Sequence, residues 1–174
     1  MNITMDYPVV DVEPDMMHRA MEEAELLKRQ WGANTTDFNR YRDVVGSLGE
    51  QAFLRYLESV GLKEGVDFDR HPLETVGRGG DFYDFRFFNG STVDVKTSTG
   101  GYDLLVKVKS ALERPCSYYV AAVLWCGSPL RVCLVGYVGY SQVLNRKPKL
   151  LRAWDYVVEE RYLKNVDFFK DLRK

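Results

Sequence analysis

The segment Gly80-Asp-Phe-Tyr-Asp-Phe-Arg-Phe-Phe-Asn-Gly-Ser-Thr-Val-Asp-Val-Lys-Thr-Ser98 decides the fold, because two β-like runs flank a turn signal. Asn89-Gly90 is the strongest short-range hairpin signal in the chain. A two-residue turn there would mix apolar and charged side chains on both faces of the hairpin. A three-residue turn over residues 88–90, with the glycine left-handed, separates the two classes and places Asp84 opposite Asp94. Since burial of one face normally determines register, we predict the three-residue turn.

In this register the hairpin has one apolar and one polar face, with Phe82 as the single exception. The apolar face consists of Tyr83, Phe85, Phe87, Val93 and Val95. The polar face consists of Asp84, Arg86, Thr92, Asp94, Lys96 and Ser98.

The two opposed carboxylates on the polar face predict a metal site. Directly opposed Cβ atoms lie about 5 Å apart, and like charges at that separation repel. A divalent cation with oxygen ligands removes this penalty, and Mg²⁺, with Mn²⁺ as a substitute, suits Asp84 and Asp94. Lys96 lies on the same face as Asp94 and completes a group suited to phosphodiester hydrolysis.

Two amphipathic helices are predicted before the hairpin. The first begins at Pro14, a residue that a first helical turn tolerates, and ends at Trp31. The second covers about residues 38–60, follows N-cap candidates at 34–37, and ends at Gly61. The apolar stripe of the second helix consists of Tyr41, Val45, Leu48, Ala52, Tyr56 and Val60.

Gly46 and Gly49 fall inside the apolar arc of the second helix, although glycine there costs about 1 kcal/mol relative to alanine. We interpret both as positions where the helix packs closely on a sheet. Glu50 lies just beyond the arc, so we expect its carboxylate along the edge of that sheet.

Most of the remaining chain is predicted to be β-structure, with a loop at residues 77–80. Besides the hairpin, the predicted strands are residues 66–70, 104–109, 118–126, 131–138 and 154–163. A short helical turn is expected at 140–145 and a terminal helix at 166–172. Helices followed by a mostly β half indicate an α/β or mixed α+β fold.

The composition, 45% hydrophobic and 28% charged over 174 residues, indicates one globular domain covering residues 1–174. The longest apolar run, 118–126, is about half of what a bilayer crossing requires, so we expect no membrane partner. The first residues show no secretory signal, which favours a cytoplasmic protein. The aromatic residues Tyr118, Tyr119 and Trp125 lie in apolar strands and are interpreted as core.

The sulfur and imidazole inventory restricts the kind of metal site. Cys116, Cys126 and Cys133 are odd in number and lack C-x-x-C spacing. Two of them lie in apolar runs, which is typical of buried thiols in a reducing compartment. His18 and His71 alone exclude a histidine-rich centre, so any metal must be held by oxygen.

The net charge of −1 hides an uneven distribution. Residues 1–39 carry three Lys/Arg against eight Asp/Glu, whereas residues 146–174 carry nine against five. Any nucleic-acid-binding surface must therefore be local, and we interpret the charge alone as a solvated acidic helix face and a solvated basic tail. Candidate contacts to a DNA backbone are Arg40, Arg42, Thr97, Ser98, Lys107 and Lys109.

Gly46-Ser-Leu-Gly-Glu50 on a helix, then Asp84, then Asp94-Val95-Lys96, resembles the PD-(D/E)XK nuclease superfamily, especially its archaeal Holliday-junction resolvase and phage or viral exonuclease branches. The resemblance covers residues 38–140. It implies a restriction-endonuclease-like core, a central mixed β-sheet flanked by helices in the order α-β-β-β-α-β. A phage- or virus-encoded protein is one source that it suggests.

The resemblance also implies roles for these residues. Asp84, Asp94 and the backbone carbonyl of Val95 would hold Mg²⁺ with the help of Glu50, and Lys96 would activate the attacking water. The implied activity is that of a magnesium-dependent deoxyribonuclease, an endo- or exonuclease that leaves 5′-phosphate and 3′-hydroxyl ends. DNA is the implied partner, and a homo-oligomer is expected.

The chain departs from the family pattern at two places. Tyr83-Asp84 stands where the family has Pro-Asp, and Asp81 is a second candidate for the first metal ligand. The acidic helix 14–31 and the chain beyond Val138, which includes the basic extension 146–174, have no assigned counterpart. This leaves the substrate open between DNA ends, single strands, junctions and RNA. Two further functions stay open: an inactive nucleic-acid-binding or assembly module of the same fold, and a small-molecule phosphohydrolase with a closed pocket.

Overall fold

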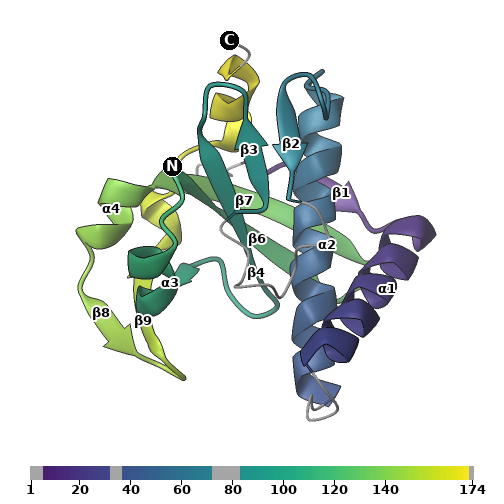
Figure 1. The fold of residues 1–174 in the computed structure, drawn as a ribbon, viewed down its shortest axis with the longest axis horizontal. Coiled ribbons are helices and arrows are strands. Elements are labelled where there is room, and N and C mark those ends of the chain that lie inside the picture. The colour runs from purple at the N-terminus through teal and green to yellow at the C-terminus, as the bar shows by residue number, and fades with distance from the viewer. Residues whose placement is uncertain (1–5, 32–36, 72–82, 173–174) are drawn as a thin grey trace.

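The structure is a computed structural model that describes residues 6–31, 37–71 and 83–172, and it contains two β-sheets with helices packed on them (Figure 1). The larger sheet has six strands in the order β1-β7-β6-β4-β3-β2. Its strands are β1 (Val9–Asp11), β2 (Phe68–Arg70), β3 (Phe85–Phe87), β4 (Thr92–Ser98), β6 (Tyr118–Trp125) and β7 (Arg131–Gly139). Only β4 and β6 run parallel, so the sheet is mixed. The predicted mixed α/β class is therefore confirmed.

The smaller sheet has three strands in the order β5-β9-β8 and lies beside the larger one (Figure 1). Its strands are β5 (Leu104–Lys107), β8 (Pro148–Leu150) and β9 (Trp154–Val158). Two short helices, α3 (Val108–Glu113) and α4 (Tyr140–Leu144), pack against it. The sequence predicted α4 but neither α3 nor β8, and this sheet was not foreseen as a separate unit.

The long helices α1 (Pro14–Trp31) and α2 (Asp37–Ser59) agree with the predicted ranges to within one residue. After α2, Gly61 has a φ of +82°, a left-handed conformation that favours glycine. The Leu62 amide then donates to the Leu57 carbonyl at 2.9 Å, so the predicted helix end is confirmed. None of the helices in the described part of the chain is long and apolar enough to span a membrane.

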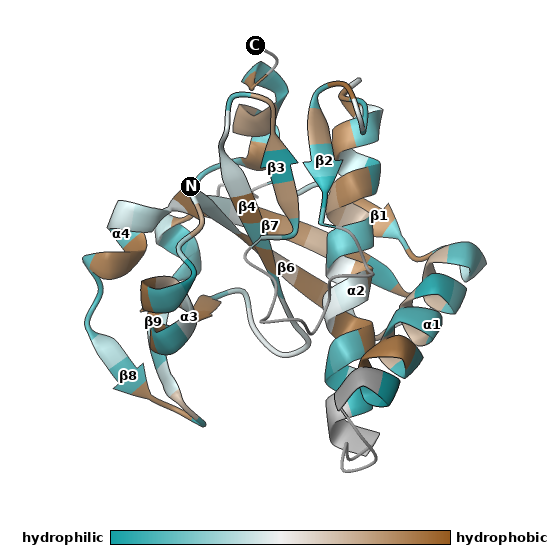
Figure 2. Ribbon diagram, in the orientation of Figure 1, coloured by the Kyte–Doolittle hydropathy of each residue, from teal (hydrophilic) through white to brown (hydrophobic). Residues whose placement is uncertain are grey.

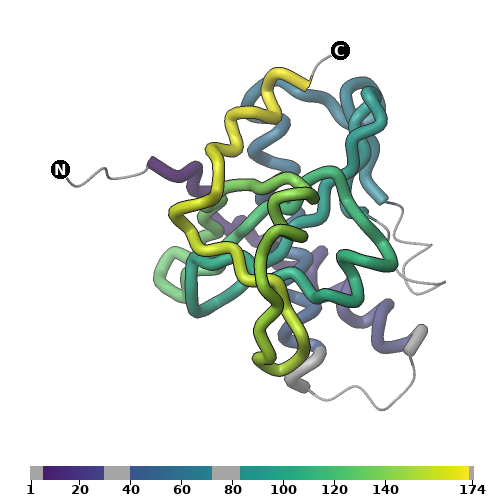
Figure 3. Tube along the Cα trace, turned by 90° about the vertical axis from the view of Figure 1, so that its left-hand side faces the viewer, coloured from purple at the N-terminus to yellow at the C-terminus, as the bar shows by residue number. Residues whose placement is uncertain are grey.

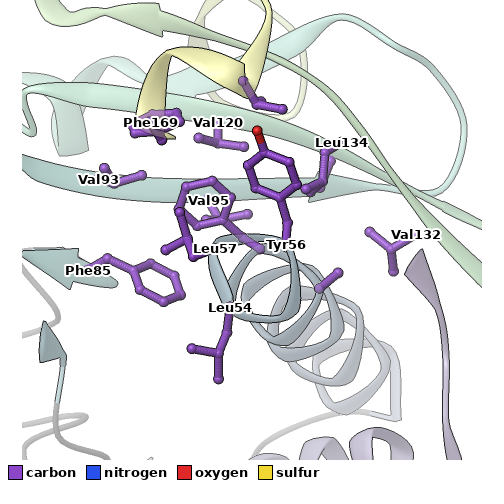
Figure 4. Close-up of a cluster of buried hydrophobic side chains, with 14 of the residues drawn as sticks. Leu54, Tyr56, Leu57, Phe85, Val93, Val95, Val120, Val132, Leu134 and Phe169 are labelled. Atoms are coloured by element: carbon purple, nitrogen blue, oxygen red, sulfur yellow. The ribbon is translucent and has the colours of Figure 1, made fainter. Parts of the chain in front are cut away.

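The main core lies between α2 and one face of the six-stranded sheet, closed at one end by the 3₁₀ helix η3 (Val166–Asp171). Figure 4 shows α2 side chains such as Leu57 pointing at the strands, with Phe169 of η3 above them. Phe53 contacts both Phe85 and Phe169 edge-on, at centroid distances of 5.1 and 5.2 Å. This aromatic contact joins the helix, the hairpin and the C-terminal segment in one core.

A second core lies between the opposite face of the six-stranded sheet and the smaller sheet. Tyr119 and Val135 contribute from the larger sheet, and Val106 and Val158 contribute from the smaller one. The six-stranded sheet is therefore apolar on both faces over β6 and β7, which explains why these strands read as continuous hydrophobic runs.

The hairpin has the predicted register. Phe85 pairs with Val93, and the Phe87 amide donates to the Ser91 carbonyl at 2.8 Å, which leaves residues 88–90 as the turn. Gly90 has a φ of +85°, so the left-handed glycine is confirmed. Tyr83 is an exception to the predicted faces, because the chain bends at Asp84 and Tyr83 packs against the second core.

The two glycines of α2 have different roles. A Cβ atom at Gly49 would lie 1.8 Å from the Thr97 hydroxyl oxygen, so only glycine allows α2 to approach β4 this closely. A Cβ atom at Gly46 would meet nothing within 4 Å. Close packing on the sheet is therefore confirmed for Gly49 and was the wrong explanation for Gly46.

Several strand predictions were too long at one end. The predicted strand 104–109 ends at Lys107 and turns into α3, so Lys107 and Lys109 do not alternate on one strand. The predicted strand 154–163 ends at Val158 before the 3₁₀ helix η2 (Glu160–Tyr162). The strand predicted at 66–70 begins at Phe68, and the terminal helix at 166–172 is 3₁₀.

Some predicted core residues are exposed. Tyr41, Trp125 and Cys126 are exposed, because they lie at the first turn of α2 and at the tip of β6. Cys116 and Cys133 are buried, and all three thiols are free. The N-cap candidates before residue 37, the loop at 77–80 and Asp81 lie outside the described residues.

Candidate functional site

A cleft of about 1140 Å³ is lined by α2 on one side and by the smaller sheet and α3 on the other. We call its α2 side the helix wall, which consists of Tyr41, Arg42, Val45, Gly46 and Glu50. We call the opposite side the sheet wall, which consists of Leu105, Ser110, Arg114, Lys149, Leu151, Arg152, Val157 and Glu160. The floor is formed by Tyr83, Asp84, residues 94–98 and the loop 99–103.

Asp84 lies immediately before β3, and its carboxylate replaces a backbone carbonyl as the hydrogen-bond acceptor for an amide of β4. The pairing of β3 with β4 ends at Phe85 and Val93, so no β3 carbonyl lies opposite the next amide of β4. Instead Oδ2 of Asp84 accepts a hydrogen bond from the Val95 amide at 2.6 Å. This bond holds the Asp84 carboxylate at the edge of β4 and over the floor of the cleft.

Asp84 lies in a group of acidic side chains, and these neighbours affect its pKa. Burial raises the pKa of Asp84 well above its usual value, and the negative charges of Glu50 and Asp94 raise it further. Lys96 and the Val95 amide act in the opposite direction. The structure therefore brings Glu50, Asp84, Asp94 and Lys96 close enough to act on one another, as the sequence predicted.

Asp94 and Lys96 form an ion pair on the floor. The Lys96 ammonium lies 2.7 Å from Oδ1 of Asp94, with 15% of the Asp94 side chain exposed and 37% of the Lys96 side chain exposed. Burial lowers the pKa of Lys96, but the charges of Asp94 and Asp84 outweigh burial and raise it overall. Lys96 is therefore a cation over the whole physiological pH range.

The donor set suits a hard cation in type but does not form a closed cage. Asp84, Asp94, Glu50 and the backbone at Val95, which also borders the cleft, supply only oxygen donors on this side. Within residues 6–31, 37–71 and 83–172, however, no three His, Cys, Asp or Glu side chains are grouped so as to hold a metal ion. The Asp94 carboxylate is directed to Lys96 instead. A bound cation would have to share Asp94 with that ammonium.

Cys116 lies close enough to this group to feel its charges. Burial, followed by the charges of Asp94 and Asp84, raises the pKa of the Cys116 thiol to about 12. The thiol is therefore neutral at pH 7.

Cations occupy both rims of the cleft above this acidic floor. Arg42 belongs to the helix wall, and Arg114, Lys149 and Arg152 belong to the sheet wall. Arg40, predicted together with Arg42, instead points away to an ion pair with Glu25 at 2.6 Å. The sheet-wall cations were missed as site residues, although the basic composition of residues 146–152 was a signal for them.

The two predicted hydroxyl donors, Thr97 and Ser98, have different surroundings. Thr97 Oγ1 is buried against Gly49 and has no hydrogen-bond partner among the described residues. The Ser98 hydroxyl donates to the Gly101 carbonyl at 2.6 Å, which shapes the loop at the cleft floor. His71 packs edge-on against Tyr83 at 5.4 Å and does not border the cleft.

A buried polar network behind Glu50 was also missed. The Ser47 hydroxyl donates to the buried Glu23 carboxylate of α1, and the Gln51 amide donates to the Met16 carbonyl at 3.0 Å. Ser47 and Gln51 flank the cleft-facing positions 46 and 50 of α2. The network therefore fixes the rotation of α2 that turns Glu50 toward the cleft. The sequence signal for this network was the Glu23 carboxylate on the inner face of α1. In the sequence alone, such a residue cannot be told from an ordinary polar interruption of an apolar stripe.

The cleft combines an acidic floor with one ammonium, two rims that carry cations, and a hairpin register that brings Asp84 to β4. These observations rest on the chain alone. No protein-family model, no curated protein and no solved structure matches it.

Proposed function

We propose that this chain is a divalent-metal-dependent deoxyribonuclease of the PD-(D/E)XK type. The observation that carries the proposal is the convergence of Asp84, Asp94 and Lys96 on the floor of a cleft whose rims carry cations. The rim cations would attract a polyanion, and the acids on the floor would hold a divalent metal that offsets the negative charge of the scissile phosphate.

Each residue has a distinct role in this proposal. Asp84 and Asp94 hold Mg²⁺ or Mn²⁺, with the Val95 carbonyl and Glu50 on the same side. When bound, the metal polarises the phosphodiester and lowers the pKa of a coordinated water. Lys96 stays protonated and stabilises the negative charge that develops on the phosphate. The Val95 amide keeps the Asp84 carboxylate in place throughout.

The order of elements supports the same assignment. From α2 the chain continues through β2, β3, β4, α3 and β6, which follows the α-β-β-β-α-β order of a restriction-endonuclease-like core with β5 added before α3. The parallel pair β4–β6 carries the Asp-x-Lys element at the centre of the larger sheet. The cleft volume also exceeds the roughly 300–1000 Å³ of small-molecule pockets, which favours a polymer over a small phosphate ester.

One observation favours a second candidate function. Asp94 is paired with Lys96, and the described residues contain no three-ligand group for a metal. A nucleic-acid-binding module without turnover fits that arrangement equally well. The two candidates differ in whether Asp94, which is paired with Lys96, can also serve as a ligand of a divalent metal.

A cleavage assay tests the proposal. Plasmid, linear and branched DNA are incubated with the protein in Mg²⁺, in Mn²⁺ and in chelator. We expect metal-dependent cleavage by the wild type, and a loss of about 100-fold or more in Asp94→Asn, which removes an anionic metal ligand, and in Lys96→Ala, which removes the ammonium that stabilises negative charge in the transition state.

Asp69→Asn and Lys63→Ala serve as matched controls, since both residues lie outside the cleft and change charge in the same way. Thermal unfolding of all four variants shows which of them are folded. Undiminished cleavage by both site variants would contradict the mechanism. Metal-independent DNA binding without cleavage by the wild type would favour the binding module.

A further inference from the structure

Gly46 lies near the middle of α2, where neither packing nor backbone conformation requires a glycine. Glycine in a helix interior is less favourable than alanine. At Gly49 the close contact with Thr97 accounts for the residue, but a Cβ atom at Gly46 would meet nothing within 4 Å among the described residues. Gly46 is helical and does not have a positive φ. The absence of a side chain at this position therefore calls for another explanation.

The surface that Gly46 leaves bare belongs to the cleft. Arg42, Gly46 and Glu50 are four residues apart, which places them in one line along α2, and all three border the cleft. Figure 2 shows hydrophilic and hydrophobic colours alternating along α2, and Figure 3, viewed from the side of the smaller sheet, shows the β8–β9 hairpin in front of that helix. The line carries a cation at one end, bare backbone in the middle and an acid at the other end.

A ligand that contacts Arg42 and also reaches the acidic floor has to lie across Gly46. Residues 42 and 50 are about 12 Å apart along the helix axis, at about 1.5 Å per residue, so one phosphate group cannot contact both ends of the line. A chain of linked phosphates can, because each strand of a duplex carries a negative charge about every 3.4 Å along the axis.

The direction of helical side chains makes position 46 decisive for such a ligand. Side chains on a helix lean toward its N-terminus, so a side chain at position 46 would fill the space between Arg42 and the floor. Glycine keeps that space open and allows a ligand to approach the helix backbone directly.

We propose that Gly46 is a clearance position, where the sugar–phosphate backbone of one nucleic-acid strand lies against α2 between Arg42 and the acidic floor. Gly46 is then a specificity determinant that admits a polymer, because a small phosphate ester on the floor does not extend across it. This inference rests on the proposed function, since it concerns the ligand of the same cleft.

Equilibrium binding without turnover tests the clearance. The full chain is titrated in chelator, at several salt concentrations, against a labelled single-stranded DNA oligonucleotide and against a closed hairpin duplex. For each form that the wild type binds, we expect Gly46→Leu to weaken binding by about fivefold or more, because the leucine overlaps the strand. The slope of log affinity against log salt should fall by about 1, as for one lost phosphate contact, although no charge is changed.

Three comparisons distinguish clearance from a structural role. Gly46→Leu should unfold at the same temperature as the wild type or a higher one, because leucine favours a helix. Arg42→Gln should lower the salt slope in the wild type but not further in Gly46→Leu, because the strand no longer reaches Arg42. Ser59→Leu is the matched control, since it adds the same side chain to an exposed position of α2 outside the cleft.

Four outcomes would overturn the inference. They are equal affinity and slope for Gly46→Leu and the wild type, additive slope changes for Gly46→Leu and Arg42→Gln, an equal loss in Ser59→Leu, and no binding of either DNA form by the wild type. Gly46→Ala, with the smallest added group, should weaken binding less than Gly46→Leu. If Gly46→Leu is unfolded, Gly46→Ala decides the question, and wild-type affinity in that variant overturns the clearance.

The two proposals fail separately. Metal-dependent cleavage by the wild type combined with unchanged DNA affinity in Gly46→Leu would leave the nuclease and remove the clearance. Loss of affinity and slope in a folded Gly46→Leu, with no cleavage by the wild type under any metal, would leave the clearance and remove the nuclease.

Discussion

The helix wall and the sheet wall face each other across one cleft, but they are supported differently. The helix wall belongs to a helix of 23 residues that packs on the sheet through Gly49 and the Phe53 aromatic cluster. The sheet wall belongs to strands of three to five residues, and the Tyr7 hydroxyl ties it to the N-terminal segment through Glu160. Its tip exposes Leu150, Leu151 and Trp154, whereas the helix wall exposes only Tyr41 among its large apolar residues.

Because of this difference, the helix wall is suited to positioning an acid, and the sheet wall is suited to contacting a ligand. The acid on the helix wall, Glu50, is held in place by two packed helices and a buried hydrogen-bond network. The groups on the sheet wall are exposed cations and apolar side chains on a small sheet. In the proposed function, the firmly packed helix wall positions the acid and the more exposed sheet wall contacts the ligand. This arrangement allows the cleft to accept a polymer.

The largest effect is expected at the contact between α2 and β4. Gly49→Ala places a methyl group 1.8 Å from Thr97 Oγ1, an overlap that costs about 3 kcal/mol. The gain in helix propensity offsets about 1 kcal/mol. We therefore expect a net loss of about 2 kcal/mol in the free energy of unfolding, measured by urea denaturation.

Gly46→Ala is the matched control, since nothing lies within 4 Å of its added methyl group. We expect it to be neutral or to stabilise by up to about 1 kcal/mol. The double variant Gly49→Ala/Thr97→Ala should recover part of the loss, because it removes the overlapping hydroxyl. Equal effects of the two glycine variants would show that the helix wall is not held by close packing.

The same contact shows what the sequence was able to predict. The helix wall follows from a 3.6-residue period over six turns, and Gly49 and Glu50 are placed by that period alone. The hairpin register followed from the alternation of Phe and Val with charged residues around Asn89-Gly90. Asp84, Asp94 and Lys96 were found because both patterns are local and span few residues.

The sheet wall was not predictable in the same way. β8 is three residues long, begins with Pro148 and has no buried side chain, so it leaves no periodic signal. Residues 104–109 are apolar enough for a strand, and only the tertiary packing of Ala111 in the second core distinguishes α3. The pairing of β5 with β9 joins residues about fifty apart in the chain, a long-range contact that no local pattern encodes.

The acidic floor between the walls should lower stability at neutral pH. Because its pKa is raised in the fold, Asp84 binds its proton more tightly when folded, so stability falls as pH rises from the unfolded value through the folded pKa. Asp84→Asn removes the charge and keeps an acceptor for the Val95 amide. We expect it to be more stable than wild type at pH 7, since it removes the cost of a buried charge beside Glu50 and Asp94.

Asp167 in η3, behind the helix wall, serves as a control because its pKa is shifted in the opposite direction to that of Asp84. Hydrogen bonds from Lys170 and Tyr56 lower the pKa of Asp167, so its contribution is present at neutral pH and is lost as pH falls through the folded value. Asp167→Asn should therefore destabilise at pH 7, where Asp84→Asn stabilises. Thermal melts between pH 4 and 8 distinguish the two, and parallel profiles would contradict the raised pKa of Asp84.

A smaller effect is expected at the support of the sheet wall. Tyr7→Phe removes the hydrogen bond to Glu160, with an expected loss of about 1 kcal/mol. Tyr56→Phe, which removes a bond to Asp167 at 2.8 Å behind the helix wall, should cost a similar amount. Hydrogen exchange separates them, because only Tyr7→Phe should increase exchange in η2 and β9. Faster exchange in α2 instead would mean that the two walls are one cooperative unit.

The smallest effects should come from the rims, and they test whether both walls contact the same ligand. We expect Arg42→Gln and Arg152→Gln each to reduce the slope of log affinity for DNA against log salt by about 1, as for the loss of one phosphate contact. Arg40→Gln is the control on the same helix, because Arg40 is paired with Glu25 away from the cleft. A change for Arg42→Gln alone would confine the ligand to the helix wall. Equal changes at both rims require a chain of phosphates that spans the cleft, which a small phosphate ester does not supply.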